Sequence, residues 1–289
     1  MAKKPTRLVH CISLGCPRNL VDSEVMLGLL GTNGYTPTPH LEKADVIIVN
    51  TCGFLDAARR ESLDVIRSAL SKKNPQAKVI VAGCLSHASP EALDELRGSL
   101  HCVVGSGDVE KIVEAASSEA PSVTESSARS YLEQGEVPRL LSTPPHYAYC
   151  KIAEGCRKAC SYCIIPHIKG PLRSRQVDDV VREISNLVDR GAFEIILIAQ
   201  DLGDFGKDLG FSAALLPSPH SACKNSCRTL RPPASPSARS APNSFTSLIW
   251  SALGLPAVSL PNPPAMNVPN PPAVSLPNPP AVSLRKPSA

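Results

Sequence analysis

A change in composition near Phe211 limits the part of this 289-residue chain that can fold. All 26 acidic residues and 24 of the 30 basic residues lie in residues 1–211, which therefore carry a net charge of −2. The 78 residues after Phe211 contain six basic residues, no acidic residue and 17 of the 29 prolines. From Pro261 an eight-residue proline-rich unit occurs three times. Such a tract favours extended conformations and cannot bury a core, so we expect residues 212–289 to form a disordered low-complexity tail.

The uneven charge also limits the binding partners that the sequence indicates. The net charge of +4 comes from the tail, so it does not indicate direct binding of nucleic acid. The best apolar run, at 248–260, is short and interrupted by Ser, Gly and Pro, so we expect no membrane span. No positive and apolar leader opens the chain, which favours a reducing compartment, the cytoplasm. There, clustered cysteines are typical of metal ligands or catalytic thiols rather than disulfides.

Short apolar runs alternate with helix-like segments over the first 115 residues, as in β-α units packed on a parallel sheet. The expected strands cover residues 8–14, 46–49, 79–82 and 102–104. Residues 21–30 and 57–70 place apolar side chains at spacings of three and four, as helices that cover a sheet do. The pattern predicts an α/β domain with a parallel sheet at 6–116. A linker rich in Ser, Glu and Pro follows at 117–145.

A second β-α pattern occupies residues 146–211 and contains three neighbouring cysteines. A strand is expected at 147–153, a helix at 177–190 and another strand at 194–199. Directly after the first of these strands, Cys156, Cys160 and Cys163 have the spacing Cys-x3-Cys-x2-Cys. Three thiolates on a four-iron cluster leave one iron open to the nitrogen and oxygen atoms of a small molecule. The alternative is a zinc site completed by His167.

Three further cysteines, Cys16, Cys52 and Cys84, each follow an expected strand. The turns at the carboxyl ends of neighbouring parallel strands converge on one crevice, so these thiols could meet there and hold a second cluster. The alternative is that they are separate, buried and inert cysteines. Cysteines inside the expected strands are predicted to be core residues: Cys11, Cys102 and Cys150. Cys223 and Cys227 lie in the tail and are interpreted as incidental thiols.

Several motifs around these cysteines resemble the radical S-adenosylmethionine methylthiotransferases. They are Ser-Leu-Gly-Cys-Pro-Arg-Asn at 13–19, Val-Asn-Thr-Cys-Gly-Phe at 49–54, Ala-Gly-Cys-Leu at 82–85, and Glu-Gly-Cys at 154–156 through Cys-Ile-Ile-Pro at 163–166. The resemblance covers residues 6–211. The run after Cys16 and the segment 197–201 resemble the RimO-like branch, which modifies an aspartate of a ribosomal protein. Relatives that modify tRNA, MiaB-like, usually have Gly-Cys-Gln-Met-Asn in the first motif.

The resemblance implies two 4Fe-4S clusters and S-adenosylmethionine as cofactors. Cys156, Cys160 and Cys163 would hold the cluster that binds S-adenosylmethionine, and Cys16, Cys52 and Cys84 would hold the cluster that carries sulfur. Tyr162 would help to shape the pocket for the cofactor's adenine, with a packing role as the alternative. A low-potential electron donor would be a partner.

The implied reaction adds a methylthio group to the β-carbon of an aspartate in a small-subunit ribosomal protein, after a deoxyadenosyl radical has removed a hydrogen. A tRNA methylthiotransferase and an inactive, truncated iron-sulfur protein are the alternatives. The family barrel needs further β-α units, and usually a small carboxyl-terminal β domain. Residues 146–211 would therefore form only a partial radical SAM (β/α) barrel.

Charged residues near the end of this region are further candidates for binding. Lys169, Arg173 and Arg175 could bind carboxylates of a substrate or cofactor, and a solvated basic face is the alternative. Gln200 and Asp201 end an expected strand, a position typical of an active-site rim.

Overall fold

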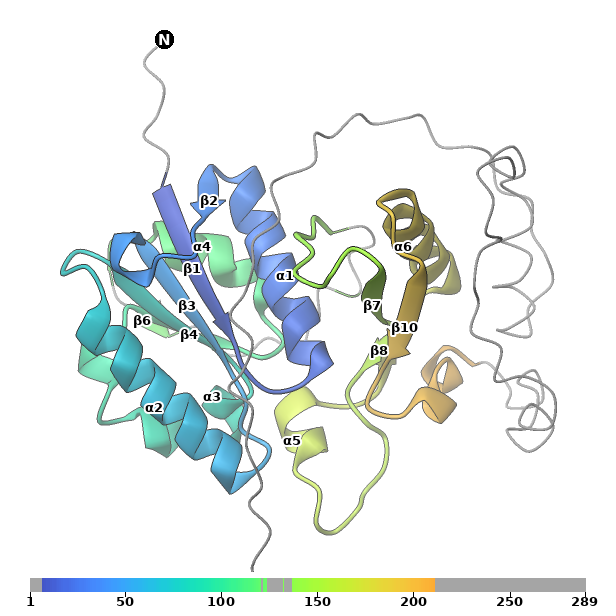
Figure 1. Cartoon of the computed structure of the whole chain (residues 1–289). Coiled ribbons are helices and arrows are strands. Elements are labelled where there is room, and N and C mark those ends of the chain that lie inside the picture. The colour runs from blue at the N-terminus through green and yellow to red at the C-terminus, as the bar shows by residue number, and fades with distance from the viewer. Residues whose placement is uncertain (1–6, 121, 124–131, 133–136, 211–289) are drawn as a thin grey trace, which may run out of the picture.

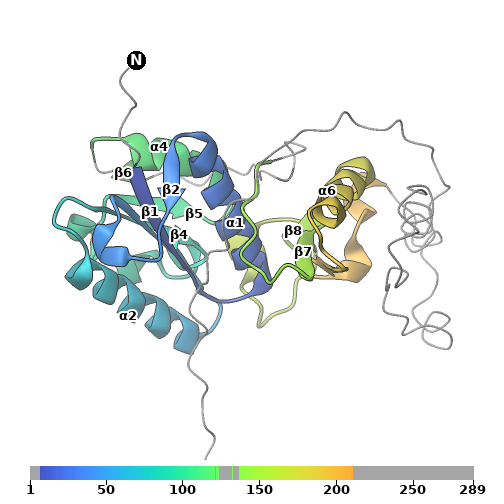
Figure 2. The same cartoon turned by 45° about the horizontal axis from the view of Figure 1, so that its top comes forward.

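The computed structural model describes residues 7–120, 122–123, 132 and 137–210, and Figure 1 shows them as two lobes. We call residues 7–123 the amino lobe and residues 137–210 the carboxyl lobe. Helix α1 (Pro17–Thr32) lies between the sheet of the amino lobe and the carboxyl lobe in both Figure 1 and Figure 2. The residues expected to form the tail, with the apolar run at 248–260 and Cys223 and Cys227, lie outside the described residues.

A parallel sheet forms the centre of the amino lobe. Within the described residues its strand order is β2-β1-β3-β4-β5-β6, and every neighbouring pair is parallel. The strands are β1 (Arg7–Ser13), β2 (Tyr35–Pro37), β3 (Val46–Thr51), β4 (Lys78–Gly83), β5 (Cys102–Gly105) and β6 (Ser122–Val123). Every residue of β3 is buried. This is the environment of a central strand that is covered on both faces.

Helices cover both faces of this sheet. They are α1, α2 (Asp56–Lys72), α3 (Leu85–Ala88) and α4 (Ile112–Ser117). Residues of α1 and α4 pack on the face that carries Ile48 and Ile80, whereas α2 packs on the face that carries Ile47 and Val49. Successive side chains of a strand point to opposite faces, so the uninterrupted apolar run of β3 supplies both cores.

The carboxyl lobe contains one parallel β-α-β unit. Strands β7 (Tyr147–Lys151) and β10 (Glu194–Ile198) pair in parallel, and α6 (Val177–Asp189) packs against them through its apolar face. Two short strands, β8 (Ala153–Glu154) and β9 (Arg173–Ser174), pair antiparallel, and α5 (Ile165–Lys169) precedes β9. Short 3-10 turns occur at Leu41–Lys43, Pro90–Leu93, Arg97–Ser99, Val109–Lys111, Leu202–Asp204 and Lys207–Leu209.

The structure confirms the predicted α/β class and the parallel sheet. The four strands expected in the amino lobe are confirmed to within two residues at each end, and the helix and final strand of the carboxyl lobe are confirmed as α6 and β10. The predicted core cysteines are confirmed as buried, with exposed fractions of 8% for Cys11, 1% for Cys102 and 0% for Cys150. No helix in the described ranges is long and apolar enough to cross a membrane.

Three details differ from the expectations. The strand expected at 147–153 is two strands, because the chain changes partner at Ile152: its N–H donates to Ile198 O at 3.0 Å and its carbonyl accepts from Arg175 N at 2.9 Å. The expected linker at 117–145 includes β6, which pairs with β5. Strands β2, β6 and β9 have three residues or fewer, too few to produce a recognisable alternation.

Candidate metal centres

The three dispersed cysteines lie at the same edge of the amino-lobe sheet. Cys16 follows β1 and precedes the first residue of α1, while Cys52 and Cys84 directly follow β3 and β4. These strands are neighbours and run parallel, so their carboxyl ends meet at one edge. We refer to Cys16, Cys52 and Cys84 as the amino trio.

The turn before Cys16 packs directly against Cys52. Gly15 has a φ of +88°, a conformation that L side chains rarely adopt. A Cβ atom on Gly15 would lie 2.8 Å from Cys52 Cβ and 3.1 Å from Cys52 Sγ. Glycine therefore permits both the backbone conformation and the close approach of these two cysteine-bearing turns.

One buried amide connects all three turns of the amino trio. Asn19 is 1% exposed, and its Nδ2 donates to the carbonyls of Leu14 at 3.1 Å and Thr51 at 2.8 Å. The thiol of Cys84 donates to Asn19 Oδ1, with an Sγ to Oδ1 distance of 3.6 Å. Sequence reasoning missed this role of Asn19, because no spacing rule links an asparagine in the first turn of a helix to two other strand ends.

The surroundings of the amino trio shift the pKa values of Cys16 and Cys84 in opposite directions. Burial would raise the pKa of Cys16, but the backbone N–H groups of Asn19 and Arg18 and the cations of Arg18 and Lys169 lower it overall. Burial raises the pKa of Cys84, and negative charge at Cys52, Asp22 and Cys16 raises it further, against the cation of Lys169. These thiols therefore lie close enough for the ionisation of one to oppose that of another. A bound metal would offset this repulsion with its positive charge and favour the thiolate forms, because its ligands must be deprotonated.

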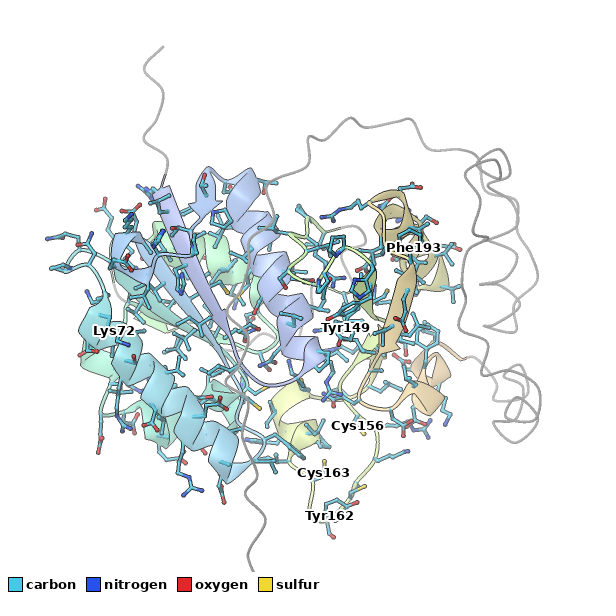
Figure 3. All side chains as sticks on the ribbon, viewed as in Figure 1. Lys72, Tyr149, Cys156, Tyr162, Cys163 and Phe193 are labelled. Atoms are coloured by element: carbon cyan, nitrogen blue, oxygen red, sulfur yellow. The ribbon has the colours of Figure 1, made fainter. Side chains whose placement is uncertain are left out.

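The second set, the carboxyl trio of Cys156, Cys160 and Cys163, lies on the loop between β8 and α5 (Figure 3). Cys156 and Cys163 are partly exposed and Cys160 is exposed. The N–H of Cys163 donates to Cys160 O at 3.0 Å, which closes a turn. Tyr162 is 90% exposed and lies at the outer end of this loop, so it does not serve as a packing residue here.

Each trio supplies three thiolates, the donor set of a four-iron cluster that keeps one iron open. In the described part of the chain, no three His, Cys, Asp or Glu side chains are gathered closely enough to hold one metal ion, whereas a zinc site needs four ligands around one point. Each thiolate of a four-iron cluster binds its own iron, so its ligands are spread apart. Beside Cys16, the buried Nε of Arg18 has no hydrogen-bond partner among the described residues. Acceptor atoms of a bound group would satisfy such a donor.

The carboxyl end of β10 contacts the loops of both trios. Arg18 Nη1 donates to Ala199 O at 2.8 Å, which links the Cys16 turn to this strand end. Lys158, in the loop of the carboxyl trio, forms an ion pair with Asp201, and this hydrogen bond lowers the pKa of Asp201. Asp201 therefore lies beside the carboxyl trio, at the strand end where the sequence places a rim residue.

Lys169 and Arg175 are not part of a solvated basic face, so that interpretation was wrong for both. Each is only 5% exposed. Lys169 Nζ lies 2.9 Å from Glu154 Oε1, and Arg175 forms an ion pair with Glu183. Sequence alone could not assign these partners, because the pairing depends on how the elements pack.

Comparison with known families finds one match, in the amino lobe. Residues 8–105 match the family described as Uncharacterized protein family UPF0004. This match covers the strands and the turns that carry the amino trio. The amino lobe is thus similar to the UPF0004 family over residues 8–105.

More extended similarity links the chain to one named group of enzymes. The chain is 56% identical over 202 residues to "Ribosomal protein uS12 methylthiotransferase RimO" of Protochlamydia amoebophila (strain UWE25). The matched stretch covers 70% of this chain and 42% of that protein. A protein of the same name from Pelotomaculum thermopropionicum is 43% identical over 205 residues, 70% of this chain and 46% of the relative. The chain is therefore similar to these RimO methylthiotransferases over 70% of its length, and it spans less than half of their length.

A solved structure with a distant likeness is the radical S-adenosylmethionine methyltransferase TsrM from Kitasatospora setae with cobalamin and a [4Fe-4S] cluster bound. The TM-score is 0.46 at 15% identity, over 73% of this chain and 51% of that chain. This likeness identifies neither a ligand nor an activity for the present chain.

Proposed function

We propose that this chain is a radical S-adenosylmethionine methylthiotransferase whose two trios of cysteines hold two 4Fe-4S clusters. The carboxyl trio would bind the cluster that takes S-adenosylmethionine, and the amino trio would bind the cluster that carries sulfur. The observation that carries this proposal is the position of all six cysteines in turns or loops that follow strands, in a chain that is 56% identical to a RimO relative over 202 residues. On this proposal residues 6–116 are the methylthiotransferase domain, and residues 146–211 are part of a radical SAM domain.

The proposed substrate is an aspartate of a small-subunit ribosomal protein. The relatives' name, which specifies ribosomal protein uS12, supports this substrate class over tRNA. A side-chain base cannot remove a proton from an unactivated C–H bond at neutral pH, so the reaction needs cofactor chemistry. A three-thiolate cluster, when bound, supplies an electron to S-adenosylmethionine at its open iron. A low-potential electron donor would be required as a partner.

The residues of this chain would hold the two sites in place. Asn19 would orient the three turns of the amino trio through its contacts with Leu14, Thr51 and Cys84. The ion pair of Lys158 with Asp201 would hold the loop of the carboxyl trio against the end of β10. Tyr162, exposed on that loop, is available to contact the adenine of the cofactor.

A non-catalytic iron-sulfur protein is the second candidate. The observation that favours it is the carboxyl lobe, whose described residues form one parallel β-α-β unit, β7, α6 and β10, which is only part of a (β/α) barrel. Such a protein would bind iron and yet fail to cleave S-adenosylmethionine.

Anaerobic reconstitution of the full chain, with counting of iron and sulfide, tests the two sites. We expect about eight irons per chain, and about four after alanine replaces the three cysteines of either trio. The control is Cys102→Ala, a buried strand cysteine outside both trios, which should keep about eight. Unchanged iron content after both trios are replaced would refute the proposed sites.

The activity needs a separate measurement. With a low-potential reductant, the reconstituted chain should cleave S-adenosylmethionine and add a methylthio group to ribosomal protein from a deletion strain, detected by mass spectrometry. A mass increase on tRNA alone would favour the tRNA-modifying alternative. Full iron content without cleavage would favour the non-catalytic protein.

A further inference from the structure

Four ionisable side chains outside both trios are buried where the two lobes meet. They are Asp22, Lys151, Glu154 and Lys169, and none is more than 5% exposed. Lys169 Nζ lies 2.9 Å from Glu154 Oε1 and 3.5 Å from Asp22 Oδ2. Lys151 Nζ forms an ion pair with Asp22 Oδ1 and lies 3.5 Å from Glu154 Oε1. Each cation thus contacts both carboxylates, so the four charges alternate around a closed ring, which we call the charge ring.

The charge ring is neutral as a whole, and this explains how four ions can be buried together. An isolated ion in a protein interior loses its hydration without compensation, whereas a paired one recovers part of it. Burial by itself would lower the pKa of Lys151, yet the carboxylates of Asp22 and Glu154 raise it overall. Removal of one member would therefore leave an uncompensated buried charge.

The members of the charge ring come from elements that carry or border the two trios. Asp22 lies on α1, the helix that begins immediately after Cys16. Glu154 lies in β8, two residues before Cys156, and Lys169 ends α5, the helix that follows Cys163. Near Lys169, Ser106 Oγ in the amino lobe donates to Ile168 O at 2.9 Å, which also holds α5 against that lobe.

Ion pairs constrain relative position more strictly than apolar contacts do. Two apolar surfaces can slide by a fraction of a side chain and keep most of their buried area. A ring of four alternating charges forms all of its ion pairs only when the elements that carry it are in one relative position. A shift that lengthens one of these contacts leaves a buried charge without its partner.

We propose that the charge ring is a positioning device in which Asp22, Lys151, Glu154 and Lys169 set the separation of the amino and carboxyl trios. Its members are positioning residues, because they act through the cysteine-bearing turns rather than on a reacting atom. The inference rests on the proposed function only in its assignment of the two trios as cluster ligands.

A double-mutant cycle on the full chain tests whether the ring acts as one unit. Asp22→Asn and Lys151→Met each leave a net charge buried, whereas the double variant leaves the neutral pair of Glu154 and Lys169. We expect each single variant to accelerate hydrogen exchange of the amides in α1 and β7 about a hundredfold, and the double variant to lie within about tenfold of the native chain. The control is Arg182→Gln, which removes an exposed ion pair with Asp179 at 2.8 Å and should change exchange little.

The second measurement separates positioning from simple stabilisation. In anaerobically reconstituted protein that circular dichroism shows to be folded, the magnetic interaction between the two reduced clusters should change in the single variants and return toward its native value in the double variant. The inference would be overturned if the magnetic interaction between the clusters were unchanged in folded single variants. It would also be overturned if the effects of the two substitutions on hydrogen exchange simply added in the double variant. If no clusters form, the proposed function fails, and the exchange cycle still decides whether the four charges act together.

Discussion

At the scale of single residues, position in the fold gives neighbouring cysteines different chemistry. Cys11 lies inside β1, where burial raises its pKa to about 12. Cys16, only five positions later, lies in the turn beyond the strand and has a lowered pKa. Burial also raises the pKa of Cys150, inside β7. The chain therefore separates packing thiols within strands from thiols at strand ends that can reach a ligand.

Alkylation of the metal-free native protein checks this difference. The thiolate is the reactive form, and a raised pKa keeps a thiol protonated at neutral pH, so Cys11 and Cys150 should resist iodoacetamide until the protein unfolds. The exposed Cys160 serves as the comparison and should react readily. Peptide mass spectrometry with and without denaturant gives the extent of labelling at each position. Labelling of Cys11 at the rate of Cys160 in the folded protein would contradict the expectation.

At the scale of elements, α6 determines whether the β-α-β unit of the carboxyl lobe has a core. Its buried residues recur at spacings of three and four along the helix and pack over β7 and β10: Val177, Val180, Val181, Ile184 and Leu187. Asp178 and Asp179 in the first turn favour helix formation because they lie near the positive end of the helix dipole.

Truncation of Ile184, which is 4% exposed, should destabilise this lobe. We expect Ile184→Ala to lower the free energy of unfolding by about 2–5 kcal/mol, from lost burial and the cavity left behind, and Ile184→Val by only about 0.5–1.5 kcal/mol. Urea denaturation followed by circular dichroism measures both. Equal effects of the two substitutions would show that the site is not close-packed.

At the scale of the whole molecule, a second set of buried charges joins the lobes. The side chain of Arg139 is 6% exposed, and its Nε donates to Glu24 Oε2 of α1 at 2.7 Å. Its Nη1 donates to Glu183 Oε1 of α6 at 2.8 Å and to Tyr149 O of β7 at 2.6 Å. One guanidinium therefore connects the helix that follows the Cys16 turn with two elements of the carboxyl lobe.

Replacement of this guanidinium should weaken the whole fold. Arg139→Met leaves the fully buried carboxylate of Glu24 without its cation, so we expect a loss of about 3–5 kcal/mol in the free energy of unfolding. Arg97→Gln is the control, because its pair with Asp94 is exposed and contributes about 0–1 kcal/mol. Thermal and chemical denaturation compare the two variants. If both variants lost a similar, small amount of free energy of unfolding, Arg139 would not join the lobes.

Local sequence patterns predicted much of the fold and the strand-end positions of the amino trio. Apolar periodicity is a property of residues that are close in sequence, so it located the long strands and helices. Their bounds in turn separated the cysteines inside strands from those at strand ends. It did not locate strands as short as β2 or β6, nor the change of partner at Ile152, because these depend on which strand lies alongside.

By itself, then, the sequence determined the α/β alternation, the core cysteines and the strand-end positions of Cys16, Cys52 and Cys84. Only the tertiary structure decided which charges are buried and paired. Asp22 and Lys151 are 129 positions apart, and no local pattern records that they form an ion pair. The physical reason is that a charge is paired by the packing of whole elements, whereas a strand or helix is specified by the residues within it.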